Sequence, residues 1–561
     1  MLTKRFWLVL FIAIAVFSLW GLGSLPFIGP DEPRYAQVAR EMLAHRELFT
    51  PVLGGFPWFE KPVLLYWIVM GSYSTLGVSE YAARLGPAIC GLLTGALVYW
   101  IGASVESGSR PLDAPSTRPE AQRDGLGRFS ALIWFSSAGP LVFSHGLNFD
   151  ILLTLTLTGA LGCFLIWHIH VGVPIKTGPK HSVSSVPKYL LIGFYCSLGL
   201  SLLAKGLVGI ILVPGILAGY FLIRREAPSR KFLLSLVWGV PLTLALGAIW
   251  YGPMLERHGL IFINDFFIQH HYARFVSNQF HHPQAFYFYL PVLLGLALPW
   301  TIFLAAGFVS SRRWKWRGAT PIDRLRVFSL VWIVAPVIFF SISQSKLPAY
   351  ILPVLPAVAL LAGERVTCFL NAQRGQRVLR LTGALILLVI AIAGIALHRH
   401  YGLAILTIAI ALAPLAAVSI IALARPQMGQ TLCILIAVAM FVTSGISLKA
   451  IAPTVARPQS VRDLLAAAAA RGYDQTPLVQ LHDIDRTAEF YGANQLIRGG
   501  DRQPMKLEGP GAVAAMAQYR GGLVLCLVPT EFESQLTSDR RMRTEVIGHN
   551  GRLSLVVVRV P

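Results

Sequence analysis

An acidic pair, Asp31 and Glu32, follows directly after the first long apolar run of this chain, and Arg34 comes two residues later. A carboxylate at such a place can accept a proton from a nucleophile or position a hydroxyl group. A neighbouring arginine can bind an anionic substrate, so Arg34 is a candidate as well. The alternative is structural, because Pro30 followed by two acids is also typical of the first turn of a helix.

A carboxylate and an ammonium group are adjacent at Glu60 and Lys61, which lie between aromatic residues and a proline. Lysine suits a phosphate because it is a compact point charge, and glutamate suits a divalent metal or a hydroxyl group. An ion pair in a loop beside an aromatic belt is the structural alternative.

Further ionisable residues lie where apolar runs begin or end. Asp150 either caps the helix that follows it or acts as a second functional acid. Lys205 either extends to the membrane interface or binds substrate, and Lys346 and Tyr350 lie at the mouth of a later apolar run. Charged groups beside membrane spans are costly and tend to be functional, so all of these residues are candidates.

A long polar segment sets His270, His271 and Arg274 among aromatic residues. Arg274 can grip a phosphate through two nitrogens. Adjacent histidines do not share a helix face, but one of them, together with a distant glutamate, can hold a metal whose shell water completes. The structural alternative is an interfacial aromatic helix.

We expect all of these acidic and basic candidate residues to lie on the same side of the membrane. Such a face suits an anionic, lipid-anchored substrate whose phosphate lies at the level of the headgroups. No glycine-rich phosphate loop follows a strand pattern, so we expect no nucleotide. An activated donor would then have to arrive attached to a lipid.

The composition indicates the elements that must position these residues. Of 561 residues, 55% are hydrophobic and 13% are charged, whereas soluble domains carry about 25% charged residues. This excludes a cytosolic globular enzyme and a disordered scaffold. The 48 Lys and Arg against 27 Asp and Glu fit cytoplasmic loops that face anionic lipid rather than nucleic acid. The 6 cysteines form no CxxC pair, so neither a zinc knuckle nor a disulfide framework is indicated.

The apolar runs predict an all-α polytopic membrane protein with about thirteen spans of roughly 20 residues each. The basic residues place the N-terminus in the cytoplasm and the candidate residues outside it. Residues 62–77 are too short to span and are assigned to an interfacial helix in the loop 27–81. The expected spans are residues 6–26, 82–104, 127–146, 149–169, 187–204, 206–223, 232–252, 285–309, 326–343, 349–369, 379–397, 402–424 and 429–448.

The last part of the chain changes character, because no run of membrane length occurs and charged residues return. Residues 1–452 are therefore predicted to be the membrane domain and 453–561 a small α/β domain outside it. The strands expected in that domain are 477–485, 522–529 and 553–560, and the helices are 461–471 and 487–491.

Several short motifs resemble those of the bacterial aminoarabinose transferases, which belong with the protein O-mannosyltransferase-like membrane glycosyltransferases of the GT-C superfamily. The resemblance covers about residues 1–370, and the later spans and the tail match only in layout. The motifs are DEPRYA at 31–36, FEKP at 59–62, E80 with ARL at 83–85, Phe267 with His271 and Arg274, and SKLPAYILP at 345–353.

The resemblance implies the GT-C fold with thirteen spans and an inverting transfer of one sugar from undecaprenyl phosphate. It favours 4-amino-4-deoxy-L-arabinose as the sugar and lipid A, or another cell-envelope glycolipid, as the acceptor, although the motifs locate the reaction better than they identify the sugar. The resemblance places the protein in the bacterial inner membrane, with the active site and tail domain in the periplasm. The expected partners are the lipid-linked donor, the acceptor and membrane lipids, with no nucleic acid and a monomeric chain. The alternatives are a protein O-mannosyltransferase-like enzyme, a transporter or flippase for lipid-linked sugars, and a non-catalytic assembly protein.

The resemblance also implies roles for the candidates. Asp31 matches the essential acid that positions or deprotonates the acceptor, and Asp150 matches a second functional acid. Lys61 and Arg274 match phosphate-binding cations that would stabilise the leaving group. The residues that match the lipid or sugar pocket are Lys205, Lys346 and Tyr350.

A divalent metal, Zn²⁺, Mg²⁺ or Mn²⁺, is the one cofactor that the resemblance implies. Glu60 matches the metal-contacting glutamate, and His271 is its expected partner. The adjacent His270 is the alternative, because the doubled histidine leaves open which of the two is the ligand.

Overall fold

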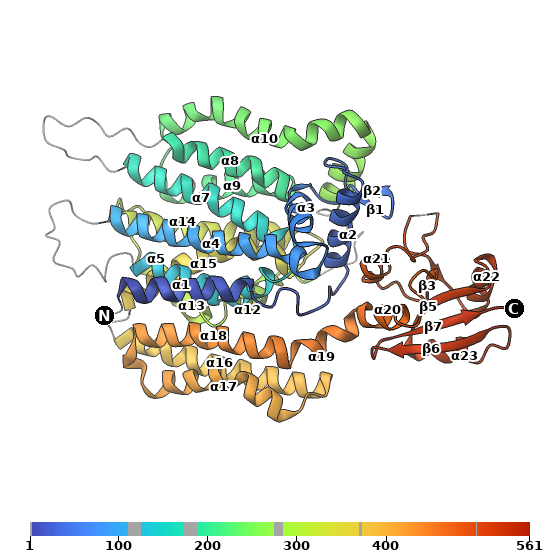
Figure 1. The fold of residues 1–561 in the computed structure, drawn as a ribbon. Helices are drawn as coiled ribbons and strands as arrows, with labels where there is room; N and C mark the ends of the chain where they lie inside the picture. Colours follow the sequence, from blue (N-terminus) through green and yellow to red (C-terminus); the bar gives the residue numbers. More distant parts are fainter. Residues whose placement is uncertain are drawn as a thin grey trace, which may run out of the picture.

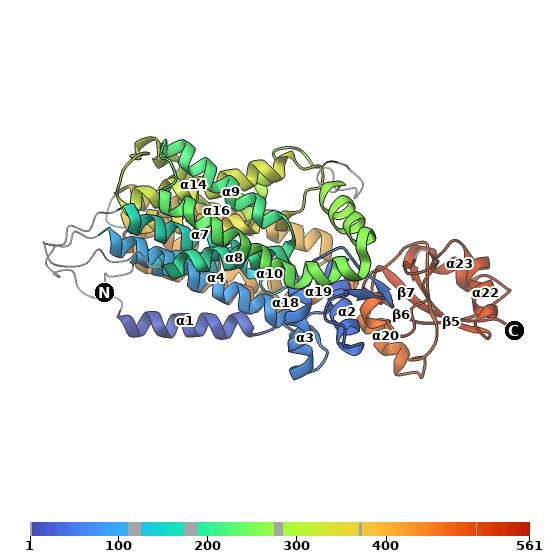
Figure 2. The same cartoon turned by 90° about the horizontal axis from the view of Figure 1, so that it is seen from above.

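The computed structural model describes residues 3–109, 125–172, 188–273, 276, 284–369, 373–500 and 502–561. A bundle of long helices fills one part of the molecule and a small sheet domain the other, with α2 and α3 between them (Figures 1 and 2). The main bundle helices are α1 Lys4–Leu19, α4 Glu80–Gly108, α5 Gly125–Ser136, α7 Asp150–Gly172, α8 Lys188–Lys205, α9 Val208–Arg224, α10 Arg230–Phe262, α14 Pro321–Ile342, α15 Leu355–Phe369, α16 Gln373–Tyr401, α17 Ile405–Ala424 and α18 Gln430–Ala450.

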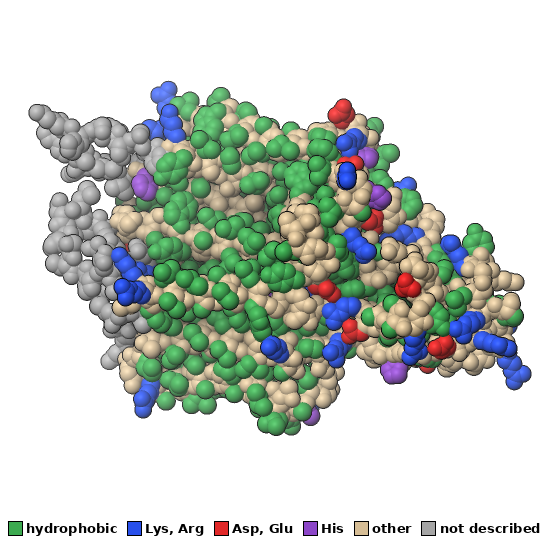
Figure 3. All heavy atoms as spheres, viewed as in Figure 1, with side chains coloured by type: hydrophobic (Ala, Val, Ile, Leu, Met, Phe, Trp, Pro, Cys, Tyr) green, Lys and Arg blue, Asp and Glu red, His purple; other side chains and the backbone are tan. Residues whose placement is uncertain are grey.

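The surface of the bundle is that of a membrane protein. Hydrophobic side chains cover its visible flank, and charged side chains gather at its two ends and over the sheet domain (Figure 3). Helix α7 lies at the centre, where Leu153, Leu157 and Phe164 are completely buried. Apolar faces toward lipid and close packing inside are what a polytopic helical protein requires.

The expected number of thirteen spans is not confirmed. In the described ranges, nine helices are long and apolar enough to cross a membrane, or ten if the bent pair of α12 (Tyr289–Leu296) and α13 (Thr301–Ser310) counts as one span. That pair bends by 117°. The run 127–146 is likewise broken, into α5 and the short α6 (Ala138–Phe143). Helices α1 and α9 have 16 and 17 residues, fewer than the roughly 20 that cross a bilayer upright.

The end of the bundle beside the sheet domain, called the polar end below, carries short elements (Figure 1). A helix, α3 (Leu64–Leu76), forms where the interfacial helix is expected, and α2 (Asp31–Ala44) precedes it; the interfacial position of α3 stays a prediction. Strands β1 (Val52–Leu53) and β2 (Phe56–Pro57) form a small antiparallel hairpin between these two helices.

The segment that follows the seventh expected span is helical. Residues 253–262 are expected in a loop, but they are helical within α10, which kinks at Gly259, and a π-helix, η2, follows over Ile263–Ala273. Aromatic packing explains the difference, because Phe262 and Phe266 stack on each other and both meet Trp250 edge-on.

The C-terminal domain is a five-stranded mixed sheet in the order β4-β3-β5-β7-β6. Three expected strands are confirmed as β3, β5 and β7, and two expected helices as α20 and α21; β4, β6 and α22 were not expected. The predicted boundary after residue 452 stays a prediction, since α19 (Ala452–Ala456) runs across it from the bundle. The elements of the domain are α20 Arg462–Ala469, β3 Leu478–Leu481, α21 Ala488–Tyr491, β4 Lys506–Leu507, α22 Pro510–Tyr519, β5 Leu523–Pro529, α23 Glu533–Thr537, β6 Arg543–His549 and β7 Leu553–Arg559.

Candidate functional site

Two cavities meet at the polar end of the bundle. The smaller has a volume of about 360 Å³ and the larger of about 730 Å³. Three side chains, those of Lys61, Lys205 and Tyr350, line both cavities. They therefore form a shared wall at which groups of two different ligands can meet.

Helix α2 begins at Asp31, so that Arg34 lies one turn further on and faces the same way. Arg34 Nη2 is 2.8 Å from Asp31 Oδ1, and its Nη1 is 3.5 Å from Glu60 Oε2. Glu60 Oε1 in turn lies 3.3 Å from Lys61 Nζ. Burial alone would lower the pKa of Arg34, but the carboxylates of Glu60 and Asp31 outweigh it and raise this pKa above its ordinary value. Arg34 is therefore a permanent cation between two acids.

A second ion pair joins the ends of two neighbouring helices. Asp150 is the first residue of α7 and Lys205 the last residue of α8. Lys205 Nζ contacts Asp150 Oδ1 and lies 4.5 Å from the centre of the Tyr350 ring. Both side chains of the pair are nearly buried, with 12% of Lys205 and 11% of Asp150 exposed. Asp150 therefore starts a helix and also lines the larger cavity, and its role as a second functional acid stays a prediction.

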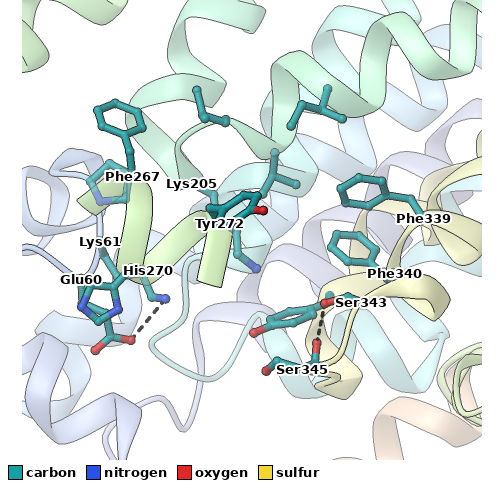
Figure 4. A pocket seen from close by; sticks show the side chains of 15 residues that line it. Glu60, Lys61, Lys205, Phe267, His270, Tyr272, Phe339, Phe340, Ser343 and Ser345 are labelled. Atoms are coloured by element: carbon teal, nitrogen blue, oxygen red, sulfur yellow. Dashed lines mark hydrogen bonds and ion pairs between the residues drawn. The ribbon is translucent and has the colours of Figure 1, made fainter. Parts of the chain in front are cut away.

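The smaller cavity has polar and apolar parts (Figure 4). Glu60, Lys61 and His270 lie together on one side of it, and Phe339 and Phe340 lie on the other. Helix α9 and the turn before it add apolar lining from Leu207, Val208 and Ile211. A cavity with cations at one end and hydrocarbon walls suits a phosphate attached to a long apolar chain.

The larger cavity lies between distant parts of the chain. One wall comes from the segment that leads into α2 and carries Asp31 and Glu32. Another part of the lining comes from α18, α19 and the residue between them and includes Ser447 and Ile451. Sequence reasoning missed this part of the lining. The described residues of α18 and α19 that line the cavity include no ionisable residue, so nothing in the sequence pointed to them.

Most of the predicted site residues come together. Eight of them line at least one cavity or contact a residue that does: Asp31, Arg34, Glu60, Lys61, Asp150, Lys205, Lys346 and Tyr350. Lys346 itself is buried, and its Nζ donates at 2.6 Å to the carbonyl of Ser343, which lines the smaller cavity. Lys346 is not among the described residues that line either cavity. Arg274 and the side chain of His271 lie outside the described residues.

Sequence reasoning also missed the role of Glu32, which binds Arg84 of α4. Arg84 Nε and Nη2 donate to the two oxygens of Glu32 at 3.0 and 2.8 Å. The same guanidinium donates to the carbonyls of Leu22, Leu25 and Pro26. The pair therefore fixes the path of the chain from α1 into α2. Glu32 stands out in the sequence as the second of two adjacent acids. Its partner Arg84 could not be predicted, because it lies 52 residues away in the sequence.

We expect Arg84→Met to lower the free energy of unfolding by about 3–5 kcal/mol, because it leaves the mostly buried carboxylate of Glu32 without its partner. Unfolding in detergent measures this change. The control is Arg457→Met, which removes an arginine that is 68% exposed and 3.9 Å from Asp463, a surface pair worth about 1 kcal/mol or less. An equal effect of both substitutions would contradict the structural role of the buried pair.

Solved structures identify the architecture. The fold matches ArnT from Cupriavidus metallidurans bound to undecaprenyl phosphate, with a TM-score of 0.78 and 24% identity over 99% of this chain and 98% of that chain. The archaeal oligosaccharyltransferase AglB from Archaeoglobus fulgidus matches more remotely, with a TM-score of 0.50 and 14% identity over 98% of this chain and 74% of that one. The fold is that of the GT-C membrane glycosyltransferases, as the motifs predict.

Sequence comparison narrows the resemblance. The family model of dolichyl-phosphate-mannose-protein mannosyltransferases matches residues 4–108. The undecaprenyl phosphate-alpha-4-amino-4-deoxy-L-arabinose arabinosyl transferase of Yersinia enterocolitica is 29% identical over 361 residues, 64% of this chain and 58% of that protein. The undecaprenyl phosphate-alpha-4-amino-4-deoxy-L-arabinose arabinosyl transferase 2 of Sodalis glossinidius is 30% identical over 381 residues, which are 67% of this chain and 61% of that protein. The matched part covers less than two thirds of the length of either relative. The predicted similarity to aminoarabinose transferases is confirmed.

Proposed function

We propose that this protein transfers one sugar from a polyprenyl phosphate to a glycolipid of the cell envelope. The sugar would be 4-amino-4-deoxy-L-arabinose, the donor undecaprenyl-phosphate-linked, and the acceptor lipid A. The observation that carries this proposal is the shared wall of Lys61, Lys205 and Tyr350 between two cavities. It lets a lipid phosphate in the smaller cavity face an acceptor in the larger one.

The reaction breaks the bond between the sugar C1 and the phosphate oxygen of the donor, and negative charge grows on that phosphate. Lys61 and Lys205 lie where they can stabilise this charge in a site of low polarity. A single attack by the acceptor oxygen forms the new bond to C1 and inverts it. An acceptor phosphate is already ionised and needs little base catalysis, so that Asp31 would mainly orient the acceptor. The released product is the polyprenyl phosphate.

The orientation in the bacterial inner membrane belongs to the same proposal. Basic residues such as Arg312 and Arg313 follow α13 in the chain, and lysine and arginine side chains are visible at the end of the bundle away from the sheet domain (Figure 3). The positive-inside rule assigns that end to the cytoplasm. The cavities and the C-terminal domain would then lie on the periplasmic side, where lipid-linked donors are used.

The direct test incubates the purified protein in liposomes with the undecaprenyl-phosphate-linked aminoarabinose and lipid A. Mass spectrometry should show lipid A carrying one added aminopentose. Transfer of mannose from polyprenyl phosphate to a protein instead would favour the second candidate, a protein O-mannosyltransferase-like enzyme, to which the family match over residues 4–108 points. Movement of the donor between leaflets without transfer would contradict both and indicate a flippase.

A divalent metal near Glu60 remains a prediction. Glu60 and His270 line the same cavity, and the described residues contain no group of three or more His, Cys, Asp or Glu placed to hold a metal. A catalytic zinc usually has three protein ligands, and both oxygens of Glu60 already face cations. The side chain of His271, the expected second ligand, lies outside the described residues, and no step above passes through a metal. Dialysis against EDTA tests it, since a loss that added Zn²⁺ or Mg²⁺ restores would place a metal there.

A further inference from the structure

Tyr491, the last residue of α21, ties the C-terminal domain to the segment that leads into α2. Its hydroxyl accepts a hydrogen bond from the Phe27 backbone N–H at 2.8 Å and donates one to Glu80 Oε1 at 2.8 Å. The Phe27 ring is completely buried and meets Phe490 edge-on at 4.8 Å. One hydroxyl thus joins three separate parts of the chain.

Two arginines extend this contact on either side. Arg462 of α20 lies 3.3 Å from Glu80, at the start of α4. Arg40 of α2 donates to the Phe490 carbonyl at 3.3 Å and lies over the ring of that residue. The C-terminal domain therefore contacts the helix that begins with Asp31, not merely the end of the bundle.

The segment that Tyr491 holds is a wall of the larger cavity. Pro26, Ile28 and Asp31 from this segment line it. Another part of the lining includes Ala452 and Val455 of α19, and the chain runs from α19 directly into the C-terminal domain. The domain is thus attached to two separate parts of the lining of one cavity, and it lies beside that end of the bundle (Figure 1).

We infer that the C-terminal domain is a positioning device that fixes the width of the larger cavity, and that Tyr491 is its positioning residue. Tyr491 lines neither cavity among the described residues, so it acts through the Phe27 segment rather than on a substrate. The consequence for acceptor binding rests on the proposed function, whereas the physical coupling between domain and segment does not. Loss of the hydroxyl leaves the buried Phe27 N–H without its partner, which loosens that wall.

The test compares Tyr491→Phe with Tyr473→Phe in the full-length protein. Tyr473 is the matched control, because its hydroxyl bonds to Glu545 and Arg559 inside the C-terminal domain. Hydrogen–deuterium exchange of the amides of residues 26–35 is the first measurement. We expect at least about tenfold faster exchange in Tyr491→Phe and no change in Tyr473→Phe. Unchanged exchange in Tyr491→Phe, or equal acceleration in both variants, would overturn the inference.

The second measurement is the steady-state kinetics of transfer, with the undecaprenyl-phosphate-linked aminoarabinose as donor and lipid A as acceptor. Tyr491→Phe should raise the KM for lipid A about tenfold and change the KM for the donor less than twofold. Equal changes in both KM values would indicate general destabilisation and contradict the inference. If the wild-type protein transfers nothing, the proposed function fails, while the exchange measurement still decides whether the domain holds the segment.

Discussion

Asp31→Asn should reduce transfer to about one hundredth of the wild-type rate or less, with the protein still folded in the membrane, because the acceptor loses the carboxylate that orients it. Asp31 starts α2, lines the larger cavity and keeps 48% of its side chain exposed, so that an acceptor can reach it. Asparagine retains the shape of the side chain but removes the charge that faces Arg34 at 2.8 Å. The initial rate with labelled donor and lipid A measures the loss.

The matched control for this substitution is Glu256→Gln, which neutralises an exposed acid on α10 that lines neither cavity among the described residues. We expect wild-type transfer from it. Thermal unfolding of both variants separates a chemical loss from a folding defect. Transfer by Asp31→Asn above a tenth of the wild-type rate would contradict an essential role for this carboxylate.

The individual candidate residues could be named from the sequence, because burying a charge beside a membrane span costs free energy. Asp31, Lys61, Asp150 and Lys205 are charges beside long apolar runs, and charges in that setting are costly and tend to be functional. Their pairing was not predictable in the same way. Asp150 and Lys205 are 55 residues apart, and only the antiparallel packing of α7 and α8 brings their ends together.

The breaks in two expected spans show a second limit of sequence reasoning. Hydropathy over a whole span does not detect these breaks, although Ser136, Ser137 and Pro140 mark the first and Pro299 the second. The structure places the two breaks against each other: the Ala138 N–H donates to the Leu298 carbonyl at 2.8 Å, and Trp300 Nε1 donates to Ser136 Oγ at 2.9 Å. A broken helix within a membrane protein needs such partners for its freed backbone groups. They come from a part of the chain about 160 residues away, which no local pattern reports.

The C-terminal domain was predictable where its strands are buried. Strands β5 and β7 are continuous apolar runs between turn residues, and they are paired antiparallel at the middle of the sheet. Strand β6 was missed because it is an edge strand with the mixed sequence RTEVIGH and a half-exposed pattern. Tyr491 gave no signal at all, since a tyrosine at the end of a short helix is common and its partners Phe27 and Glu80 lie over 400 residues earlier.

Lys205→Met should both destabilise the protein and abolish transfer. The substitution leaves the Asp150 carboxylate, with only 11% of its side chain exposed, without its cation. Breaking a buried pair from one side costs about 3–5 kcal/mol. Lys205 also lies in the wall shared by both cavities, so the leaving phosphate loses a stabilising charge and transfer should fall at least about a hundredfold. Denaturant unfolding in detergent and initial rates measure the two effects.

The double substitution Asp150→Asn with Lys205→Met separates stability from chemistry. It removes both charges, so no uncompensated ion remains buried, and most of the lost stability should return. Transfer should stay at or below about a hundredth of the wild-type rate, because the cation beside the leaving phosphate is still missing. If the double variant regained transfer along with stability, the pair would only be joining α7 to α8. If stability did not return, the loss in Lys205→Met would come from packing of the long side chain rather than from the unpaired carboxylate.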